Sequence, residues 1–426
     1  MKKLLITGGA RLSGTVRIHG AKNSVLPVLA ACCLCTSPCV LHNCPDIEDV
    51  RTALAILESL GCKTRREGST LCIDASGLSK FCVEKRLAGK MRSSILFLGA
   101  LLARCGKAEL ALPGGCPLGE RPIDLHVKSL AKLGARFRFE KGILQAACRE
   151  RRDGDIFLSI PSVGATENLL LACALGSGTV TLHGAAREPE ITDLIGFLRA
   201  AGADIRGAGT SELTICGTHK LHGATYTILP DRIETATYLC MAAGCGGEVE
   251  LQRCDGRLLA PVIERLREAG CKIRCGGSEL VLKSSGKLTA VSPVTTAPYP
   301  GFPTDAQAIL MAAVLRAKGE SVFQETVFER RFLHVPALQK LGADIALSGK
   351  TARVRGVAHL HGAMLRAEDL RGAAALITAG LLAEGESEVL GLSHLARGYE
   401  NLEQNLKNLG AAIKSVDIPA PFVYNT

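Results

Sequence analysis

The chain has 426 residues, of which 47% are hydrophobic and 22% charged, an ordinary globular composition that argues against disorder. Its formal net charge of +10 favours an anionic partner, but aromatic residues make up only 4%, which disfavours nucleic acid as that partner. No apolar run is long enough for a membrane span and no secretory signal follows Met1, so we expect a cytoplasmic protein.

The chain contains 18 cysteines, and many of them lie inside apolar helical runs, where a thiol behaves as a small hydrophobic group. Cys32 and Cys35 form a C-x-x-C pair, but no second Cys or His pair stands at zinc spacing. We therefore expect free thiols in a reducing compartment and no metal.

Six nearly apolar helices are predicted along the chain. Helices that are apolar on all sides are buried, so each of them is expected in a core. In chain order they cover residues 24–35, 93–103, 168–175, 235–243, 306–317 and 372–382.

An amphipathic helix follows each apolar helix and ends at a glycine that precedes Ala or Cys. Glycine suits the left-handed conformation at a helix C-terminus, and a short strand-like stretch comes next. Six near-evenly spaced copies indicate a sixfold βαβαββ-like repeat and an α/β fold with three units in each half. The glycines are Gly61, Gly134, Gly202, Gly270, Gly342 and Gly410.

The N-terminal segment belongs with the second half of the chain. Residues 4–14 resemble residues 213–223 and 352–362, whereas the last unit lacks such a segment. We therefore predict two lobes, with the chain crossing between them near residues 20 and 230. The first lobe is residues 22–229, and the second is residues 1–21 plus 230–426.

A Gly/Pro-rich loop between a predicted strand and a predicted helix carries one thiol, Cys116. Arg121 follows it five residues later, and a fixed cation stabilises a thiolate for acid or nucleophilic chemistry. Pro122 is predicted just inside the start of the helix that runs from Ile123 to Leu133, where its missing N–H costs nothing. An incidental cysteine in a surface turn is the alternative.

Charged residues gather at the starts of the apolar helices, where free N–H groups and the helix dipole attract anions. Asp231, Glu234 and Asp369 are explained as helix caps or as ion-pair partners of Arg232 or Arg371. A cation at a helix start has no capping use, so Lys22 favours a bound anion. If both lobes point these helix ends into one cleft, the cleft is an anion site.

The Cys116 loop and the charged helix starts together resemble the motifs of a known family. The chain resembles the UDP-N-acetylglucosamine 1-carboxyvinyltransferase branch of the enolpyruvyl transferases from its first strand to about residue 415. This resemblance implies a fold of two inside-out α/β lobes, each of three repeats, with the active site in the cleft between them. The matching pieces are Gly20–Asn23, Pro113–Cys116, Arg121–His126, Ser162–Thr166, Arg187–Glu190, Leu229–Thr235, Phe302–Asp305, Glu325–Glu329, Asp369–Arg371 and Arg397–Glu400.

The resemblance implies transfer of the enolpyruvyl group of phosphoenolpyruvate to the 3-hydroxyl of UDP-N-acetylglucosamine by addition and elimination, with release of phosphate. Lys22, Arg121 and Arg397 are then expected to hold the phosphate and carboxylate of phosphoenolpyruvate. Asp305 resembles the base that takes the hydroxyl proton, and Cys116 the acid that supplies the methylene proton. In the family this cysteine is also alkylated by fosfomycin.

By the same resemblance we expect two small-molecule substrates, no cofactor, no metal, no nucleic acid and no membrane. The residues implied in substrate binding are Lys22, Asn23, Arg92, Arg121, Pro122, Ile123, Asp124, Leu125, Ser162, Val163, Gly164, Asp305, Val327, Arg371 and Arg397.

Two positions depart from the pattern of some family members: Ile160-Pro161 stands where a Lys precedes the Ser-Val-Gly stretch, and Tyr299 stands where others have His. Taken singly, Asp305 and Asp124 are also explained as helix-start carboxylates and Ser162 as a turn residue. Two other functions stay open, a shikimate 3-phosphate enolpyruvyl transferase and a non-enzymatic scaffold that binds polyanions.

Overall fold

The computed structural model describes residues 2–114, 118, 122–150 and 152–417. In these ranges the strands form six four-stranded sheets, and all six share one pattern. In each sheet the first edge strand runs parallel to its neighbour, and each of the two further strands runs antiparallel to the strand before it. Each repeat unit predicted from the spaced glycines therefore corresponds to one four-stranded sheet.

Three of these sheets are built around the first half of the chain. In strand order they are β14 (Thr225–Thr227), β3 (Cys39–His42), β5 (Thr70–Asp74) and β4 (Lys63–Glu67); β6 (Cys82–Val83), β7 (Lys107–Ala111), β9 (Ile143–Ala147) and β8 (Arg136–Glu140); and β10 (Gly154–Phe157), β11 (Thr179–His183), β13 (Glu212–Cys216) and β12 (Asp204–Arg206).

The other three are built around the second half. In strand order they are β2 (Leu12–Arg17), β15 (Gly247–Gln252), β17 (Glu279–Ser284) and β16 (Lys272–Gly276); β18 (Val294–Thr295), β19 (Glu320–Gln324), β21 (Thr351–Arg355) and β20 (Asp344–Ser348); and β22 (Met364–Arg366), β23 (Glu386–Leu390), β1 (Lys2–Thr7) and β24 (Ala412–Asp417).

Each repeat buries one apolar helix between its sheet and the other helices. α4 packs against α6, and α10 packs against both α12 and α8. These helices carry apolar residues on every face, so they are stable only when enclosed. They are α1 (Lys22–Ala31), α4 (Leu96–Cys105), α6 (Val163–Ala174), α8 (Arg232–Cys245), α10 (Thr304–Ala313) and α12 (Leu370–Leu382).

The amphipathic helices lie nearer to solvent, and each ends before one of the six predicted glycines. All six glycines have positive φ, between 92° and 104°. The helices are α2 (Glu48–Ser59), α5 (Asp124–Lys132), α7 (Pro189–Ala200), α9 (Ala260–Glu268), α11 (Val335–Lys340) and α14 (Leu402–Asn408). Shorter helical turns are α3 (Lys85–Ala88), α13 (Leu392–Leu395), η1 (Cys32–Leu34), η2 (Arg92–Ile95) and η3 (Gly256–Leu259).

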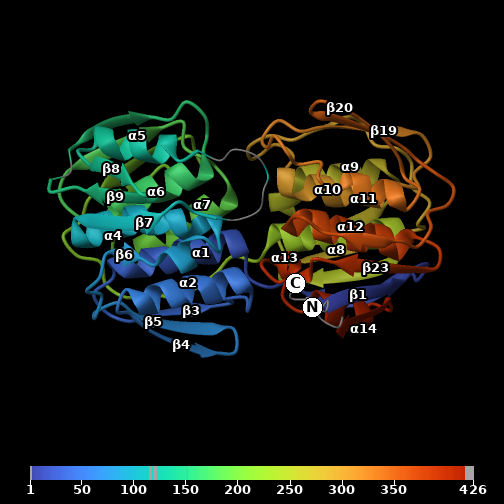
Figure 1. The fold of residues 1–426 in the computed structure, drawn as a ribbon, viewed down its shortest axis with the longest axis horizontal. Helices are drawn as coiled ribbons and strands as arrows, with labels where there is room; N and C mark the ends of the chain where they lie inside the picture. Colours follow the sequence, from blue (N-terminus) through green and yellow to red (C-terminus); the bar gives the residue numbers. More distant parts are fainter. Residues whose placement is uncertain (1, 115–117, 119–121, 151, 418–426) are drawn as a thin grey trace, which may run out of the picture.

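Two separate hydrophobic cores result. One contains buried residues between Val25 and Ile228, and the other combines residues 4–18 with residues from Ala236 to Ile413. The N-terminal strand β1, blue in Figure 1, lies beside the red strand β23 and pairs with β23 and β24. We propose that the lobe boundaries follow these cores, with residues 22–229 in one lobe and residues 1–21 plus 230–426 in the other.

The conformation of the repeat glycines can be tested at Gly270, which has a φ of 100° and where an added Cβ would meet no atom within 4 Å. We expect Gly270→Ala to lower the free energy of unfolding by about 1–2 kcal/mol. The space around the residue is open, so the cost comes only from placing a Cβ on a left-handed backbone. Urea unfolding measures this. The matched control is Gly276→Ala in β16, which also meets no atom but lacks a positive φ, and a similar loss there would contradict the explanation.

Candidate active site

Lys22, Asp49 and Arg397 form a buried charge cluster where the two cores meet. The Lys22 ammonium lies 2.8 Å from Asp49 Oδ2, and Arg397 donates from Nε to Oδ1 at 2.9 Å and from a terminal nitrogen to Oδ2 at 3.2 Å. The three side chains are only 12%, 4% and 16% exposed. One carboxylate thus faces two cations, which leaves net positive charge for an anionic ligand.

Burial lowers the pKa of Lys22, and although Asp49 raises it again, Arg397 adds to the lowering. Burial would raise the pKa of Asp49, but Lys22 and Arg397 more than offset this effect and the pKa lies below its ordinary value. Asp49 is therefore ionised at neutral pH. The charge of Lys22 in turn depends on Asp49.

Asp305, in the first turn of α10, binds two arginines. Its Oδ1 accepts from Arg331 at 2.8 Å, and its Oδ2 accepts from Arg371 Nε and a terminal nitrogen at 3.1 and 3.0 Å. Burial would raise the pKa of Asp305, but Arg371 and Arg331 lower it well below the ordinary range. The carboxylate is ionised and 27% exposed, whereas both arginines are almost fully buried.

The carboxylates at the starts of α8 and α12 are helix caps, as expected. Asp231 and Asp369 each accept hydrogen bonds from the backbone N–H groups two and three residues later, at 2.7–3.0 Å. The expectation for Glu234 was wrong, because its carboxylate binds the backbone N–H and the ring Nδ1 of His19, both at 2.9 Å. Arg232 pairs with a residue of the other core instead.

That partner is Glu190 of α7, which accepts from Arg232 at 2.9 and 3.2 Å with both side chains at most 10% exposed. Next to it, Glu188 Oε1 accepts from the backbone N–H of Tyr299 at 3.2 Å. The Tyr299 ring lies 5.8 Å from the guanidinium of Arg232. Glu167 of α6 is buried close to these two glutamates.

The residues expected to bind substrate at positions 92, 122–125 and 162–164 are held together by contacts among η2, α5 and α6. His126 Nδ1 lies 2.8 Å from the side-chain nitrogen of Asn168, and a Cβ on Gly164 would lie 3.1 Å from the His126 ring. Arg92 donates to the carbonyl of Pro122 at 3.4 Å, which ties η2 to the residues before α5.

The places of Pro122 and Ser162 in this segment differ from the sequence prediction. α5 begins at Asp124 with Ile123 in the N-cap position, so Pro122 lies before the helix rather than inside it. Asp124 stands in the first turn of α5, as a helix-start carboxylate would, and also pairs with Lys128 at the surface at 3.1 Å. Ser162 is the N-cap of α6 and accepts from the Ala165 N–H at 3.4 Å, a stronger role than a turn residue.

The remaining expected residues lie near these groups or outside the described ranges. Asn23 follows Lys22 at the start of α1, and Val327 is 44% exposed beside Glu325, whose carboxylate accepts from its N–H at 2.7 Å. Leu118, from the thiol loop, accepts from the N–H of Arg330 at 3.1 Å and so touches the other core. Gly115–Pro117 and Gly119–Arg121, with the predicted Cys116 and Arg121, lie outside the described residues.

Asp49 and Arg331 are the residues of this site whose contacts were missed in the sequence. Asp49 stands in the first turn of the first amphipathic helix, close to the place that holds charged residues just before α7, α11 and α14 in the later repeats. An alignment of the first repeat with the later ones would have identified Asp49 as a candidate site residue.

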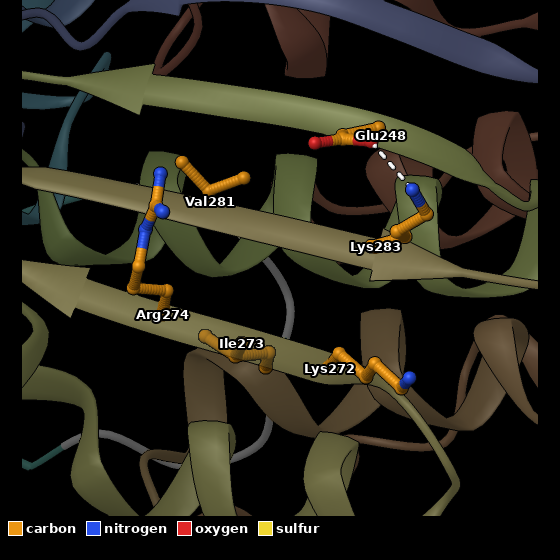
Figure 2. Close-up of a pocket in the computed structure, with 6 residues that line it drawn as sticks. All are labelled: Glu248, Lys272, Ile273, Arg274, Val281 and Lys283. Carbon is orange, nitrogen blue, oxygen red and sulfur yellow. Dashed lines mark hydrogen bonds and ion pairs between the residues drawn. The ribbon is translucent and has the colours of Figure 1, made fainter.

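Basic side chains also lie on the outer face of a sheet, where they are exposed to solvent rather than buried. Figure 2 shows Lys272, Arg274 and Lys283 on neighbouring strands, with Lys283 reaching Glu248 across the sheet. That ion pair is 3.0 Å long, and its side chains are 67% and 56% exposed. Exposed pairs of this kind are weak, so the buried cluster around Asp49 is the better candidate for specific binding.

The described part of the chain holds no group of three or more His, Cys, Asp or Glu side chains placed to bind a metal ion. None of the helices in the described ranges has the length and apolar character needed to span a bilayer.

A family model described as EPSP synthase (3-phosphoshikimate 1-carboxyvinyltransferase) matches residues 6–406. The chain belongs to this enolpyruvyl transferase family. The family includes a UDP-N-acetylglucosamine 1-carboxyvinyltransferase 2 of Caldanaerobacter subterraneus subsp. tengcongensis, 45% identical over 97% of this chain and 99% of the relative. A UDP-N-acetylglucosamine 1-carboxyvinyltransferase of Solidesulfovibrio magneticus is 46% identical over 97% and 99% of the two chains.

Solved structures of enolpyruvyl transferases have the same fold. The enolpyruvyl transferase NikO from Streptomyces tendae superposes with a TM-score of 0.89 at 30% identity, covering 98% of this chain and 99% of its own. An EPSP synthase from Acinetobacter baumannii gives 0.73 at 18% identity, over 98% and 100% of the two chains. The predicted fold class, two α/β lobes of repeats, is confirmed.

The buried Glu167 generates a prediction about stability. Burial raises its pKa well above the ordinary value, and the carboxylates of Glu190 and Glu188 raise it further. A carboxyl that binds its proton more tightly when folded makes stability fall as pH rises from about 4.3 toward the folded pKa. Glu167→Gln abolishes this loss, so the variant gains stability relative to wild type as the pH rises above about 4.3.

Urea unfolding at several pH values measures the difference. Glu264→Gln, on the exposed face of α9, serves as the control and is expected to follow the wild-type curve. If the Glu167→Gln and wild-type curves run parallel across this pH range, the raised pKa is contradicted.

Proposed function

We propose that this protein transfers the enolpyruvyl group of phosphoenolpyruvate to the 3-hydroxyl of UDP-N-acetylglucosamine and releases inorganic phosphate. The observation that carries the proposal is the pair of buried cations on Asp49, set where the two cores meet, in a chain 44–46% identical to relatives of that name. A small trianion is the ligand that such fixed cations suit.

In the first step of the proposed reaction, the 3-hydroxyl oxygen bonds to the central carbon of phosphoenolpyruvate. The hydroxyl proton goes to Asp305, and the methylene carbon takes a proton from Cys116. The product of this addition is a tetrahedral phospholactoyl adduct. Lys22, Arg121 and Arg397 hold its phosphate and carboxylate.

In the second step the bond from the central carbon to the phosphate oxygen breaks, and phosphate leaves with that electron pair. The methyl carbon returns a proton to the Cys116 thiolate left by the first step, and the enolpyruvyl ether of the sugar forms. The cations stabilise the charge that develops on the leaving phosphate. A carboxylate held by two arginines is a weak base, so Asp305 accepts the hydroxyl proton more readily once the substrate weakens those pairs.

We assign the nucleotide sugar to the segments around α5 and α6. Its proposed contacts are the residues that the family resemblance implies for this substrate. We expect Ile160 and Tyr299, which depart from some family members, to alter contacts beside the nucleotide sugar rather than the reaction. The proposed contacts are Asn23, Arg92, Arg121, Pro122, Ile123, Asp124, Leu125, Ser162, Val163, Gly164, Asp305 and Val327.

We further infer that the product enters peptidoglycan precursor synthesis in the cytoplasm, and thereby supports cell-wall biogenesis, cell shape and cell division. The described cysteines are free thiols, in keeping with a reducing compartment. The names of the relatives favour this branch over the shikimate 3-phosphate transferase, whose solved structure at 18% identity speaks for the fold alone. A scaffold that binds polyanions gives no role to the ionised, partly exposed carboxylate of Asp305 in the site.

Phosphate release from phosphoenolpyruvate tests the reaction. We expect release only when UDP-N-acetylglucosamine is present, and we expect Cys116→Ala to lower its rate by roughly 10²–10⁴-fold, because the methylene carbon loses its proton donor. Cys82→Ala, which removes an exposed thiol on β6, is the matched control and should leave the rate unchanged. Release with shikimate 3-phosphate but not with the nucleotide sugar would overturn the proposal.

Fosfomycin tests the proposed role of the thiol by a separate route. An epoxide alkylates a thiolate far faster than a thiol, so we expect one fosfomycin per chain, bound at Cys116, together with loss of phosphate release. Peptide mass spectrometry locates the adduct. The exposed Cys82 and Cys275 act as internal controls, and labelling there with Cys116 unmodified would contradict the assignment.

A further inference from the structure

Asp49 lies where the two cores are in direct contact. It is in the first turn of α2, where a carboxylate interacts favourably with the helix dipole. The segment before it is tied to the opposite core by two hydrogen bonds, from the Glu48 N–H to the Ala396 carbonyl at 2.9 Å and from the Asp46 N–H to Glu400 Oε2 at 2.8 Å. Asp49 is thus fixed relative to the segment that carries Arg397.

The contacts of Asp49 use both carboxylate oxygens. Oδ2 lies 2.8 Å from the Lys22 ammonium, and Arg397 donates to both oxygens in a two-pronged arrangement. Such bidentate pairs fix the plane of the guanidinium as well as its distance. Lys22 is attached to one core and Arg397 to the other, so a single carboxylate sets their relative positions.

We propose that Asp49 is a positioning residue for the transfer reaction, which holds the Lys22 ammonium and the Arg397 guanidinium in register across the two lobes for the anionic groups of phosphoenolpyruvate. The inference rests on the proposed function. It adds to that function a residue that does not touch the substrate.

The electrostatic surroundings of Lys22 support this role. Burial lowers the pKa of Lys22, the Asp49 carboxylate raises it, and two arginines lower it. When Asp49 is neutral, Lys22 therefore loses its proton at a lower pH. The charged groups facing Lys22 from the described elements around it are Asp49 on α2, Arg397 after α13, Arg371 on α12, Asp305 on α10 and Asp231 at the start of α8.

The test is the pH dependence of kcat/KM for phosphoenolpyruvate in Asp49→Asn, measured as phosphate release at saturating UDP-N-acetylglucosamine. We expect kcat/KM at pH 7.5 to fall at least about tenfold and its alkaline limb to move to lower pH, because Lys22 loses its proton more easily without the Asp49 carboxylate. KM for the nucleotide sugar should stay unchanged.

Asp46→Asn is the matched control. Asp46 stands three residues earlier and pairs only at the surface with Arg51, with both side chains more than 40% exposed. Such a pair contributes little, so this variant should keep the wild-type profile. A purely structural loss in Asp49→Asn would lower the active fraction at every pH and leave the alkaline limb in place, which would overturn the proposal.

Asp49→Glu keeps the charge and moves the carboxylate by one methylene group. We expect a several-fold fall in kcat/KM for phosphoenolpyruvate with the alkaline limb where it is in wild type. Wild-type kcat/KM in this variant would contradict the positioning role even if Asp49→Asn failed to fold. Wild-type protein that releases no phosphate would instead count against the proposed function, so the two failures are distinct.

Discussion

Burial of one apolar helix in each of six repeats is the constraint on which the rest of the structure depends. A helix enclosed on all sides holds an ionised side chain at lowest cost at its ends, and the unpaired N–H groups at its start favour negative partners there. Several residues of the candidate site stand at the starts of these helices, namely Lys22 on α1, Ser162–Gly164 on α6, Arg232 on α8, Asp305 on α10 and Arg371 on α12, whereas Asp49 lies on α2 and Arg397 follows α13.

The charges at these helix starts are paired with each other, and several pairs join the two cores. Asp49 binds Lys22 and Arg397, and Glu190 binds Arg232. Breaking a buried pair leaves an uncompensated charge and costs roughly 3–5 kcal/mol, so these pairs hold the cations in place without a ligand. The same pairs bring residues about 350 positions apart in the chain into one site.

The repeat and its buried helices were predictable because both are local patterns. Gly61 and its five counterparts mark helix ends, and each has the positive φ that this place requires. The partners of the charges were not predictable, because pairing depends on which helix starts meet in space. Thus Asp231 was correctly expected to be a cap, whereas Glu234 binds His19 of a crossing segment and Asp49 was overlooked. Cys116 and Arg121 stay predictions from the family resemblance.

We propose the charge cluster between the two cores as the site of an enolpyruvyl transfer. A crystal structure of Asp305→Asn with UDP-N-acetylglucosamine and phosphoenolpyruvate tests this proposal most directly. This change removes the proposed base, so the reaction stops while both substrates can still bind. We predict phosphate oxygens on Lys22 and Arg397, and the 3-hydroxyl within about 2.6–3.2 Å of residue 305. Phosphoenolpyruvate bound instead on an outer sheet face, such as that of Lys272 and Arg274, would contradict the account.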